Sequence, residues 1–469
     1  MNYFKITFIL IFFFSCNSSL KKSSKLINEK PNVIIIYTDD QGYGDLSSFG
    51  SMYIKTPNID ALGAGGAILT DFLNASSTCS PSRAALLTGA YPIRNGVNTV
   101  LWPEGHGAFG SSKSKVVGLH PDEVTIAEVL KDNGYATAMT GKWHLGDDPL
   151  FLPTKQGFDT YFGIPYSNDM NKEELPLLLN SEVVEIKPDQ SLLTQRYTDF
   201  AIDFINDQKK GEPFFLYLAH TMPHIPIFAS DKFRGKSKGS LYGDVIQEID
   251  HNVGRLVKTL KDRKEFDNTI IIYTSDNGPW LTFGNHGGSS GVLRGGKFDV
   301  FEGGYRVPCV ISWPNKIEPN TKIDQLISTI DIMPTLCAIS GAKLPENKID
   351  GINIIDLLQN KPMPEIKERF FFYHKKDTLY GIRKGNWKYL KPSTFNRVEL
   401  PGEDGKNGKG KWEDNHAESL YDLSTDLREL DNRLLDYPEI AYELKERLSE
   451  FQSKLDKEKR PLGTKENIN

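Results

Sequence analysis

The sequence predicts an α/β fold, with one large mixed, mainly parallel β-sheet sandwiched by helices and a smaller C-terminal α+β subdomain. Strand-like and helix-like blocks alternate as far as about Asn360, a pattern typical of a mainly parallel sheet with helices on both faces. Two apolar blocks, "NVIIIYTDD" at 32–40 and "NTIIIYTSDNG" at 268–278, indicate strands that are buried on both sides. A length of 469 residues also favours two structural units over a single core.

The expected elements follow one another in a regular order. Amphipathic periodicity predicts the helices, and apolar runs that end at polar residues predict the strands. We expect helices in 122–135 (ending at Gly134), 197–208, 243–262 and 330–340. We expect strands in 213–224, 268–278 and 305–314, and a strand that runs into a loop in 136–146. In the C-terminal part we expect antiparallel strands in 369–390, a polar glycine-rich loop in 401–412 and a terminal helix in 438–459. The main domain is therefore expected to cover residues 31–365 and the C-terminal subdomain residues 366–469.

The N-terminus has the pattern of a targeting segment. Lys5 supplies positive charge, and residues 6–14 are apolar apart from Thr7. This run is too short to span a bilayer as a helix, which takes ~20 residues. A cleaved export signal in residues 1–15 is the interpretation that fits this pattern.

The residues after this signal indicate a lipid anchor. Cys16, directly after Ser15, resembles the lipidated cysteine of bacterial lipoproteins, although Phe13 stands where that family usually has Leu. We expect lipidation of Cys16, a polar tether in 16–30, and attachment to a membrane of a Gram-negative-type cell envelope. The alternative is ordinary signal cleavage, which would give a soluble periplasmic or secreted protein.

Composition narrows the class of function. Hydrophobic residues make up 39% and charged residues 25% of the chain, as in soluble globular proteins. The formal net charge of −5 gives no support to nucleic-acid binding, which usually shows a basic footprint. Four cysteines in so long a chain are not a disulfide framework. Cys309 and Cys337 lie in apolar runs and are expected to be buried thiols.

Cys79 has a different setting. It begins the pentapeptide C-S-P-S-R, which leads directly into the helix-like "AALLTG" at 84–89. A cysteine near a helix N-terminus, with Arg83 close by, can be a nucleophilic thiolate of low pKa. A small residue in a turn is the alternative, and these residues by themselves favour neither interpretation.

The surrounding chain favours a third interpretation. From Pro31 to the early 430s the sequence resembles the type I sulfatases, formylglycine-dependent and arylsulfatase-like enzymes of the alkaline phosphatase superfamily. The resemblance rests on C-S-P-S-R with "LLTG" and, in order, on "YTDDQGYGD", "GKWHLG", "IPYSND", "HTMPH", "SDNGP", "GGKFDVFEGGYRVP" and "LYDLSTD". It implies that a maturation enzyme oxidises Cys79 to formylglycine (3-oxoalanine). One hydroxyl of the hydrated aldehyde then attacks sulfur, and the other later expels sulfate.

This resemblance also suggests why both apolar strands end on polar residues. Asp39 and Asp40 after the first strand, and Asp276 and Asn277 after the second, are hard oxygen ligands suited to Ca²⁺ or Mg²⁺. The resemblance implies that the modified side chain at Cys79 and a sulfate oxygen complete the shell. One Ca²⁺ per chain, in preference to Mg²⁺, would offset the carboxylates and polarise the sulfate. The alternative is that Asp39 and Asp40 simply begin a turn.

The resemblance assigns roles to the cationic residues near these ligands. Lys142 would bind the sulfate, and His144 would be the base that acts on the hydrate. Because the two are separated by one residue in "GKWHLG", an extended segment would put both on one side. Arg83, one helical turn after Cys79, would hold the hydrate.

Further roles concern the leaving group and the substrate. His220, at the end of "FFLYLAH", would protonate the leaving oxygen, and Lys297 would contact the sulfate and the bridging oxygen. Ser167 matches a sulfate-binding serine of the arylsulfatase-like branch. The candidates for substrate selection, for each of which a core or turn position is the alternative, are His224, Asn168, Asp169, Trp102 and Trp280.

The resemblance predicts a sulfatase that acts on sulfated carbohydrate, because exported bacterial members commonly serve polysaccharide breakdown. Algal polysaccharides such as ulvan or carrageenan fragments, glycosaminoglycans and mucins are all open as substrates. A phosphatase or phosphonate hydrolase on the same fold is one rival, but the His and Asp set for a second zinc ion cannot be placed in the sequence. An inactive glycan-binding protein is the other rival, and the complete set of polar site residues argues against it.

Overall fold

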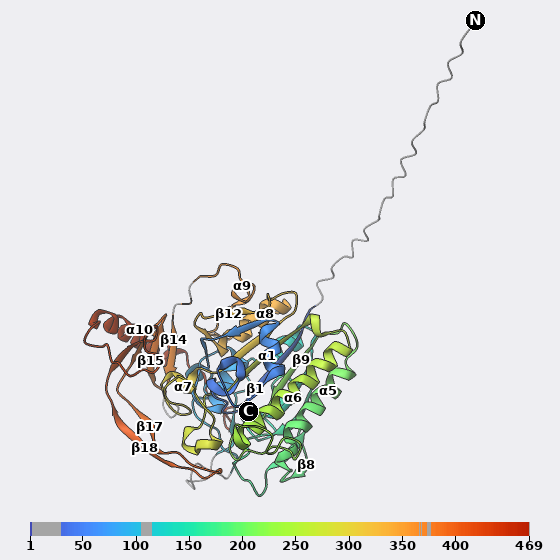
Figure 1. The fold of residues 1–469 in the computed structure, drawn as a ribbon, viewed down its shortest axis with the longest axis horizontal. Coiled ribbons are helices and arrows are strands. Elements are labelled where there is room, and N and C mark those ends of the chain that lie inside the picture. Colours follow the sequence, from blue (N-terminus) through green and yellow to red (C-terminus); the bar gives the residue numbers. More distant parts are fainter. Residues whose placement is uncertain (2–29, 105–114, 365, 367, 373–376, 469) are drawn as a thin grey trace.

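The computed structural model describes residues 1, 30–104, 115–364, 366, 368–372 and 377–468 (Figure 1). The predicted signal after Met1 and the predicted tether as far as residue 29, including Cys16, lie outside this described part. Within the described part, none of the helices combines the length and the apolar character that a membrane span requires.

A ten-stranded sheet forms the centre of the molecule, with the strand order β12-β2-β11-β10-β1-β9-β5-β6-β7-β8 (Figure 1). The five strands from β10 to β6 in this order are parallel, whereas β11 and β7 run antiparallel to both of their neighbours. The bounds are β1 Asn32–Thr38, β2 Ala67–Leu69, β5 Ala136–Lys142, β6 Thr160–Ile164, β7 Pro176–Leu179, β8 Glu182–Ile186, β9 Phe214–Ala219, β10 Thr269–Ser275, β11 Cys309–Ser312 and β12 Thr321–Ile323. The predicted mixed, mainly parallel sheet is confirmed.

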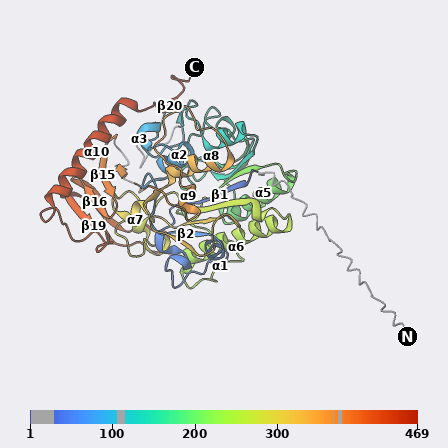
Figure 2. The same cartoon turned by 90° about the horizontal axis from the view of Figure 1, so that it is seen from above.

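Strand β1 illustrates why helices cover both faces of this sheet. Val33, Ile35 and Tyr37 belong to one hydrophobic core, while Ile34 and Ile36 belong to another, because successive side chains of a strand point to opposite faces. The first core includes residues of α2 (Cys79–Thr88), α4 (Ile126–Asp132) and α8 (Ile332–Ser340), and the second includes residues of α1 (Pro57–Ala64), α5 (Leu193–Asp207) and α6 (Ser240–Asp262). Figure 2 shows α2 and α8 on one side of β1, and α1 and α6 on the other.

Local signals in the sequence set several boundaries. The hydroxyl of Thr125 accepts a hydrogen bond from the backbone N–H of Glu128, and Glu128 Oε2 accepts one from the N–H of Thr125. This capping box begins α4, inside the predicted helix 122–135. The remaining short elements are β3 Phe72–Leu73, α3 Pro92–Asn95, β4 Val117–Gly118, α7 Glu302–Tyr305, β13 Ile327–Ser328, α9 Ile355–Leu358 and β20 Gly463–Thr464.

The C-terminal part forms its own antiparallel sheet, which α10 (Pro438–Glu458) covers (Figure 2). The sheet has the order β14-β15-β16-β19, with bounds β14 Arg369–Phe372, β15 Leu379–Lys384, β16 Trp387–Leu390 and β19 Ser419–Asp422. The rings of Phe370 in β14 and Phe451 in α10 stack with their centroids 3.9 Å apart. The predicted C-terminal sheet and terminal helix are therefore confirmed.

A long hairpin extends from this subdomain. Its strands are β17 (Ser393–Leu400) and β18 (Lys409–His416), and Figure 1 shows them along the outer edge of the molecule. The predicted loop in 401–412 is therefore wrong for 409–412, which belong to β18. The reason is that backbone pairing with β17 makes these residues a strand, although their glycines and charges are typical of a turn.

Buried ion pairs join the C-terminal sheet to the main domain. Lys388 of β16 lies 3.1 Å from Glu302 of α7 and 2.9 Å from Glu429, and all three side chains are fully buried. Arg383 of β15 contacts Glu302 at 2.8 Å and also pairs with Asp71 of the main domain. Because Glu429 Oε2 also accepts a hydrogen bond from the N–H of Glu302, the network holds the start of α7.

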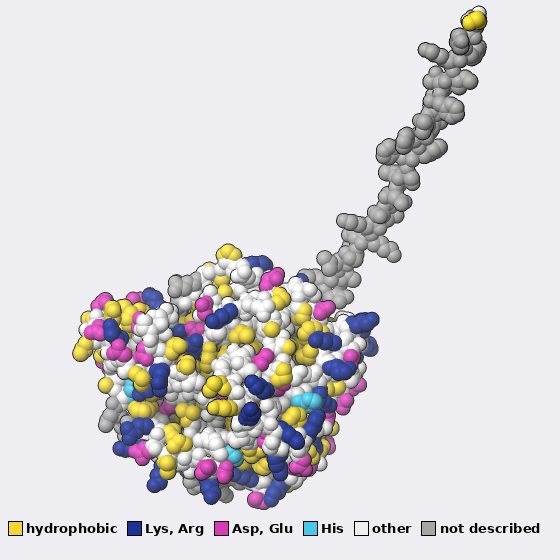
Figure 3. Space-filling view, viewed as in Figure 1, with side chains coloured by type: hydrophobic (Ala, Val, Ile, Leu, Met, Phe, Trp, Pro, Cys, Tyr) yellow, Lys and Arg dark blue, Asp and Glu magenta, His cyan; other side chains and the backbone are white. Residues whose placement is uncertain are grey.

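The surface carries both signs of charge. Figure 3 shows Lys and Arg side chains mixed with Asp and Glu across the face in view. The described residues of that face form no broad basic area of the kind that marks nucleic-acid-binding proteins, in agreement with the net charge of −5.

Candidate active site

The carboxyl ends of β1 and β10 bring the predicted metal ligands together. The two strands pair in parallel with Thr38 beside Ser275, so that Asp39 and Asp276 leave the sheet side by side. The N–H of Asp276 donates to the carbonyl oxygen of Thr38 at 3.0 Å, and the N–H of Asp40 donates to Asp276 Oδ1 at 3.1 Å. Asp40 has a φ of 62°, a left-handed conformation that turns the chain directly after the strand.

Each of the three carboxylates has a buried cationic partner. Lys142 Nζ lies 2.5 Å from Asp39 Oδ2. Lys297 Nζ lies 2.8 Å from Asp40 Oδ2. Arg83 Nη2 lies 2.8 Å from Asp276 Oδ2 and 3.7 Å from Asp39 Oδ2. Three carboxyl groups can therefore be buried side by side because three cations from other elements lie against them.

This arrangement gives Asp39 and Asp276 very different pKa values. Burial raises the pKa of Asp39, but Lys142, His224 and Arg83 outweigh it and hold that pKa far below its usual range. For Asp276, burial and the neighbouring Asp39 raise the pKa to about 7 against the opposing effect of Arg83.

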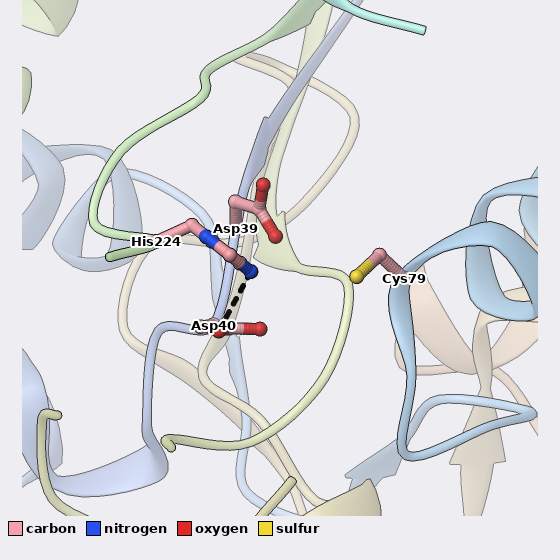
Figure 4. Close-up of side chains that lie close together, drawn as sticks. All are labelled: Asp39, Asp40, Cys79 and His224. Atoms are coloured by element: carbon pink, nitrogen blue, oxygen red, sulfur yellow. Dashed lines mark ion pairs between the residues drawn. The ribbon is translucent and has the colours of Figure 1, made fainter. Parts of the chain in front are cut away.

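The residues present fit a hard divalent cation. Oδ1 of Asp39 and Oδ1 of Asn277 are buried and have no hydrogen-bond donor among the described residues. Ligand atoms of Asp39, Asp40, Cys79 and His224 all lie within 4.8 Å of one another, and Figure 4 shows these four side chains pointing toward one space. Carboxylate and amide oxygens are ligands of hard divalent cations, so this donor set is compatible with such an ion.

Cys79 is the first residue of α2 and is buried. Burial raises the pKa of its thiol to about 11, although Lys142 and Lys297 act in the opposite direction. The unmodified thiol is therefore protonated at neutral pH, which argues against the low-pKa thiolate that a position near a helix N-terminus allows. Arg83, on the next turn of α2, points to Asp276 and donates from Nη1 to the carbonyl oxygen of Lys142 at 2.8 Å.

The segment after β5 supplies Lys142 and His144. Lys142 Nζ donates to Ser167 Oγ at 3.2 Å as well as to Asp39. His144 Nε2 lies 3.0 Å from the carbonyl oxygen of Leu101, and its buried Nδ1 has no partner among the described residues. The segment is not extended as far as His144, because β5 ends at Lys142 and His144 has a φ of 63°. Strand alternation therefore does not explain why both residues lie at the site.

The two histidines that follow β9, His220 and His224, have different surroundings in the structure. His220 is fully buried, and neither ring nitrogen has a hydrogen-bond partner in the described part of the chain. Burial lowers its pKa to about 3. His224 Nδ1 lies 2.6 Å from the carbonyl oxygen of Ile225, and Nε2 lies 3.5 Å from Asp40 Oδ2, the contact that is dashed in Figure 4.

A cavity of about 820 Å³ opens onto this cluster. The residues predicted from the sequence that line it are Cys79, Trp102, His144, Ser167, Asp169, His224, Trp280 and Lys297. His220 is not among its lining residues, and neither is Asn168, whose amide donates to Gln190 and to the carbonyl oxygen of Pro226. The predicted role of His220 in protonating the leaving oxygen therefore has no geometric support here.

Sequence reasoning missed a second group of lining residues. They are Thr99, Val100, Met170, Thr282, Phe298, Glu399, Asn407, Gly408, Lys409, Gly410 and Lys411. The last six belong to the hairpin β17–β18 or the turn that joins its strands. No local signal marks them, because only the docking of a distant hairpin brings them to the cavity.

The mainly parallel sheet presents carboxylates at its strand ends, opposite a residue at a helix start. Similar solved structures place this fold in the alkaline-phosphatase-like superfamily of hydrolases. Within that superfamily the chain belongs to the sulfatase family. The family model described as Sulfatase matches residues 31–342, and the model described as N-sulphoglucosamine sulphohydrolase, C-terminal, matches residues 296–400. The protein is thus a sulfuric ester hydrolase.

Individual relatives agree with this assignment. The chain is 40% identical to arylsulfatase A of Bos taurus over 386 residues, which cover 76% of this chain and 74% of that protein. It is 38% identical to N-acetylgalactosamine-6-sulfatase of Homo sapiens over 379 residues, 77% of this chain and 71% of that one. A sulfatase structure from work on the metabolism of multiple glycosaminoglycans by Bacteroides thetaiotaomicron superposes with a TM-score of 0.78 at 30% identity, covering 91% of this chain and 100% of the other.

Proposed function

We propose that this sulfatase removes sulfate esters from carbohydrates, with a formylglycine made from Cys79 by a maturation enzyme as its nucleophile and one bound Ca²⁺. The observation that carries the proposal is the position of Cys79. It lines the cavity at the start of α2, within 4.8 Å of oxygen atoms of Asp39 and Asp40. A hydrated aldehyde at this position supplies a hydroxyl that can attack sulfur.

The metal ligands in this proposal are Asp39, Asp40, Asp276 and Asn277, with the side chain at Cys79. The Oδ1 atoms of Asp39 and Asn277 support this set, because both are buried and have no hydrogen-bond donor among the described residues. A bound Ca²⁺ would offset the carboxylates and polarise the substrate sulfate. Ca²⁺ is preferred to Mg²⁺ because these ligands come from two strands and a helix, and Ca²⁺ accepts such irregular oxygen geometry.

Other polar side chains of the site are proposed to bind the sulfate, to position its ligands and to act as the base. Lys142, Lys297 and Ser167 lie where a negatively charged sulfate can be bound, and Arg83 holds Asp276 and the backbone of Lys142 in place. His144 is the proposed base at residue 79, because it lines the cavity and has an unpartnered Nδ1.

We assign the leaving-group proton to His224 in place of His220. Because Nδ1 of His224 bonds to the carbonyl of Ile225, Nε2 is the atom that can take up and release a proton. His224 also lines the cavity next to Trp280, with the ring centroids 5.7 Å apart. A general acid has to reach the substrate, and only His224 of the two histidines borders the space that a substrate can occupy.

We propose carbohydrate as the substrate class because the names of some similar proteins refer to sugars. One relative is named N-acetylgalactosamine-6-sulfatase, and the similar structure comes from work on glycosaminoglycans. The rival phosphatase requires a second metal site, and the described residues contain one cluster of His, Cys, Asp and Glu that fits a metal ion. The cluster includes the cysteine that formylglycine formation requires.

The experiment combines peptide mass spectrometry with product analysis. Active protein should carry an aldehyde at residue 79 and release free sulfate from a panel of defined sulfated oligosaccharides. Cys79→Ala should fold and release none. Full activity with an unmodified thiol would refute the mechanism, and faster turnover of phosphate esters than of sulfate esters would favour the rival.

We also propose export with a lipid anchor at Cys16, on the basis of the targeting pattern in residues 1–15. The mature protein should partition with membranes, and Cys16→Ser should release it or block its processing. Mature wild-type protein that is free in the periplasm, cleaved at another position, would contradict the anchor and leave simple export.

A further inference from the structure

The turn of the hairpin β17–β18, residues 401–408, is fixed against the opposite wall of the cavity. The backbone N–H groups of Gly402 and Gly408 both donate to the carbonyl oxygen of Thr282, at 2.9 and 2.8 Å. Asn285 and Asp404 exchange two further bonds: Asn285 Nδ2 donates to Asp404 Oδ1 at 3.1 Å, and the N–H of Asp404 donates to Asn285 Oδ1 at 2.9 Å. The hairpin is therefore held at both ends, by its subdomain and by the segment after β10.

Close backbone packing makes this docking specific. A Cβ on Gly284 would lie 1.9 Å from the carbonyl oxygen of Gly402, and Gly284 has a φ of 53°. A larger residue at 284 would therefore push the turn away. The sequence places a glycine on each side of the contact, as such an approach requires.

This docking places two lysines in the wall of the cavity. Lys409 and Lys411 are separated by one residue in β18, so both side chains point to the same face of the hairpin, and both line the cavity. Their ammonium groups have no hydrogen-bond or ion-pair partner among the side chains that the structure describes. Two carboxylates, Glu399 and Asp169, also line the cavity, but neither forms an ion pair with these lysines. Glu399 lies 3.4 Å from the guanidinium of Arg397, and Asp169 belongs to the segment that follows Ser167.

The buried cations of the site differ from these lysines. Lys142, Lys297 and Arg83 each hold a carboxylate at 2.8 Å or less, whereas Lys409 and Lys411 line the cavity and have exposed side chains. A volume of about 820 Å³ also lies in the upper part of the range of ligand pockets, so it has room for more than the reacting ester.

We infer that Lys409 and Lys411 form a second anion-binding subsite. The preferred substrate then carries a further anionic group, a sulfate ester or a carboxylate, on the sugar next to the one that loses sulfate. This inference rests on the proposed function, since it concerns the same cavity. It narrows the substrate class from sulfated carbohydrates in general to polyanionic oligosaccharides.

The test uses three sets of defined disaccharides: monosulfated, disulfated on both sugars, and monosulfated next to a uronic acid. Mature wild-type enzyme should show a kcat/KM about tenfold or more higher on at least one doubly anionic set than on its monosulfated counterpart. Lys409→Met with Lys411→Met should reduce this preference by about five- to twentyfold, since each exposed ion contact contributes up to about fivefold. Rising ionic strength should reduce the wild-type preference more than that of the double variant.

Lys406→Met is the matched control, because Lys406 is exposed on the same turn but does not line the cavity. It should keep the wild-type preference, whereas Gly284→Ala, which disturbs the docking, should lose it. If the double lysine variant loses the preference only for disulfated substrates, the subsite binds a sulfate. If it loses the preference only for substrates with a uronic acid, the subsite binds a carboxylate. Equal turnover of all three sets by wild type would refute the subsite while leaving the sulfatase proposal intact. No sulfate release from any sugar sulfate by protein with the aldehyde would contradict the proposed function itself.

Discussion

Asn277 donates a hydrogen bond from Nδ2 to Oδ1 of Asp40 across 2.7 Å, and this contact fixes which way its amide points. The amide oxygen is left buried with no donor among the described residues. A buried polar atom without a partner is costly unless a ligand meets it. The relationship therefore supports the proposal that Asn277 presents its oxygen to a cation.

The first prediction follows from this contact. Asn277→Ala removes one oxygen ligand and also the donor that orients Asp40, so Ca²⁺ affinity should fall by at least about tenfold. Calorimetric titration of metal-free protein with Ca²⁺ measures the change, and wild type should bind one ion per chain. Asn206→Ala, at an exposed position of α5, should bind like wild type. Unchanged affinity in Asn277→Ala would remove it from the ligand set, and two zinc ions per chain would favour a phosphatase.

The second prediction compares His224 with His220. Expulsion of a sugar oxygen requires a proton during S–O cleavage, whereas an activated aryl oxygen leaves without one. His224→Gln should therefore lose about 10²–10⁴-fold in kcat/KM on a sugar sulfate and much less on an aryl sulfate. The rates should be measured up to the sulfated enzyme, because slow release of sulfate can hide a leaving-group effect. Equal losses on both esters for His224→Gln, with a selective loss for His220→Gln, would return the role to His220.

The third prediction concerns pH and the buried ring of His220. Its pKa in the folded protein, about 3, lies below the ordinary value of 6.5. The unfolded chain therefore binds the proton first as pH falls, so folded-state stability is lost from about pH 6.5 downward. Between about pH 7.5 and about pH 5, wild type should lose ~2 kcal/mol more unfolding free energy than His220→Leu.

Urea unfolding at both pH values measures this difference. Other buried histidines, such as His144, are present in both proteins, so their contributions cancel in the comparison. The same pH dependence in the two proteins would mean that His220 gains a proton-binding partner that its surroundings do not show.

The fourth prediction concerns the ion pairs between the C-terminal sheet and the main domain. Lys388→Met removes the cation shared by Glu302 and Glu429, and leaves Glu429 with no ion pair within 4 Å among the described residues, although Arg383 still acts on it at longer range. Because a fully buried carboxylate is then unpaired, unfolding free energy should fall by about 3–5 kcal/mol. Denaturant unfolding of purified protein measures the loss.

Lys384→Met provides the control on the neighbouring strand. Lys384 pairs with Glu443 at 2.6 Å, but both side chains are more than two-fifths exposed. An exposed pair contributes at most about 1 kcal/mol, so this variant should remain close to wild type. Similar losses in the two variants would show that burial does not set the strength of the Lys388 contacts.

Much of the fold was predictable because the apolar patterns are strong and local. Residues 32–38 are apolar enough to specify a doubly buried strand, and the period of residues 243–262 specifies a helix that packs on one face. The cysteine motif and the polar residues at the strand ends could be identified for the same reason. The hairpin lysines, Lys409 and Lys411, could not, because their place in the cavity depends on backbone docking far from them in sequence.

The sequence by itself determined the chemistry that is available at the site: two strands that end on oxygen ligands, and a cysteine that begins a helix. Only the tertiary structure decided which of these residues stand side by side. In the sequence, Ile34 of the first strand aligns with Ile270 of the second, but the folded strands pair Ile34 with Ile271. This shift of one residue sets Asp39 beside Asp276. Strand register depends on hydrogen bonds and on packing against helices on both faces, and these forces act only in the assembled sheet.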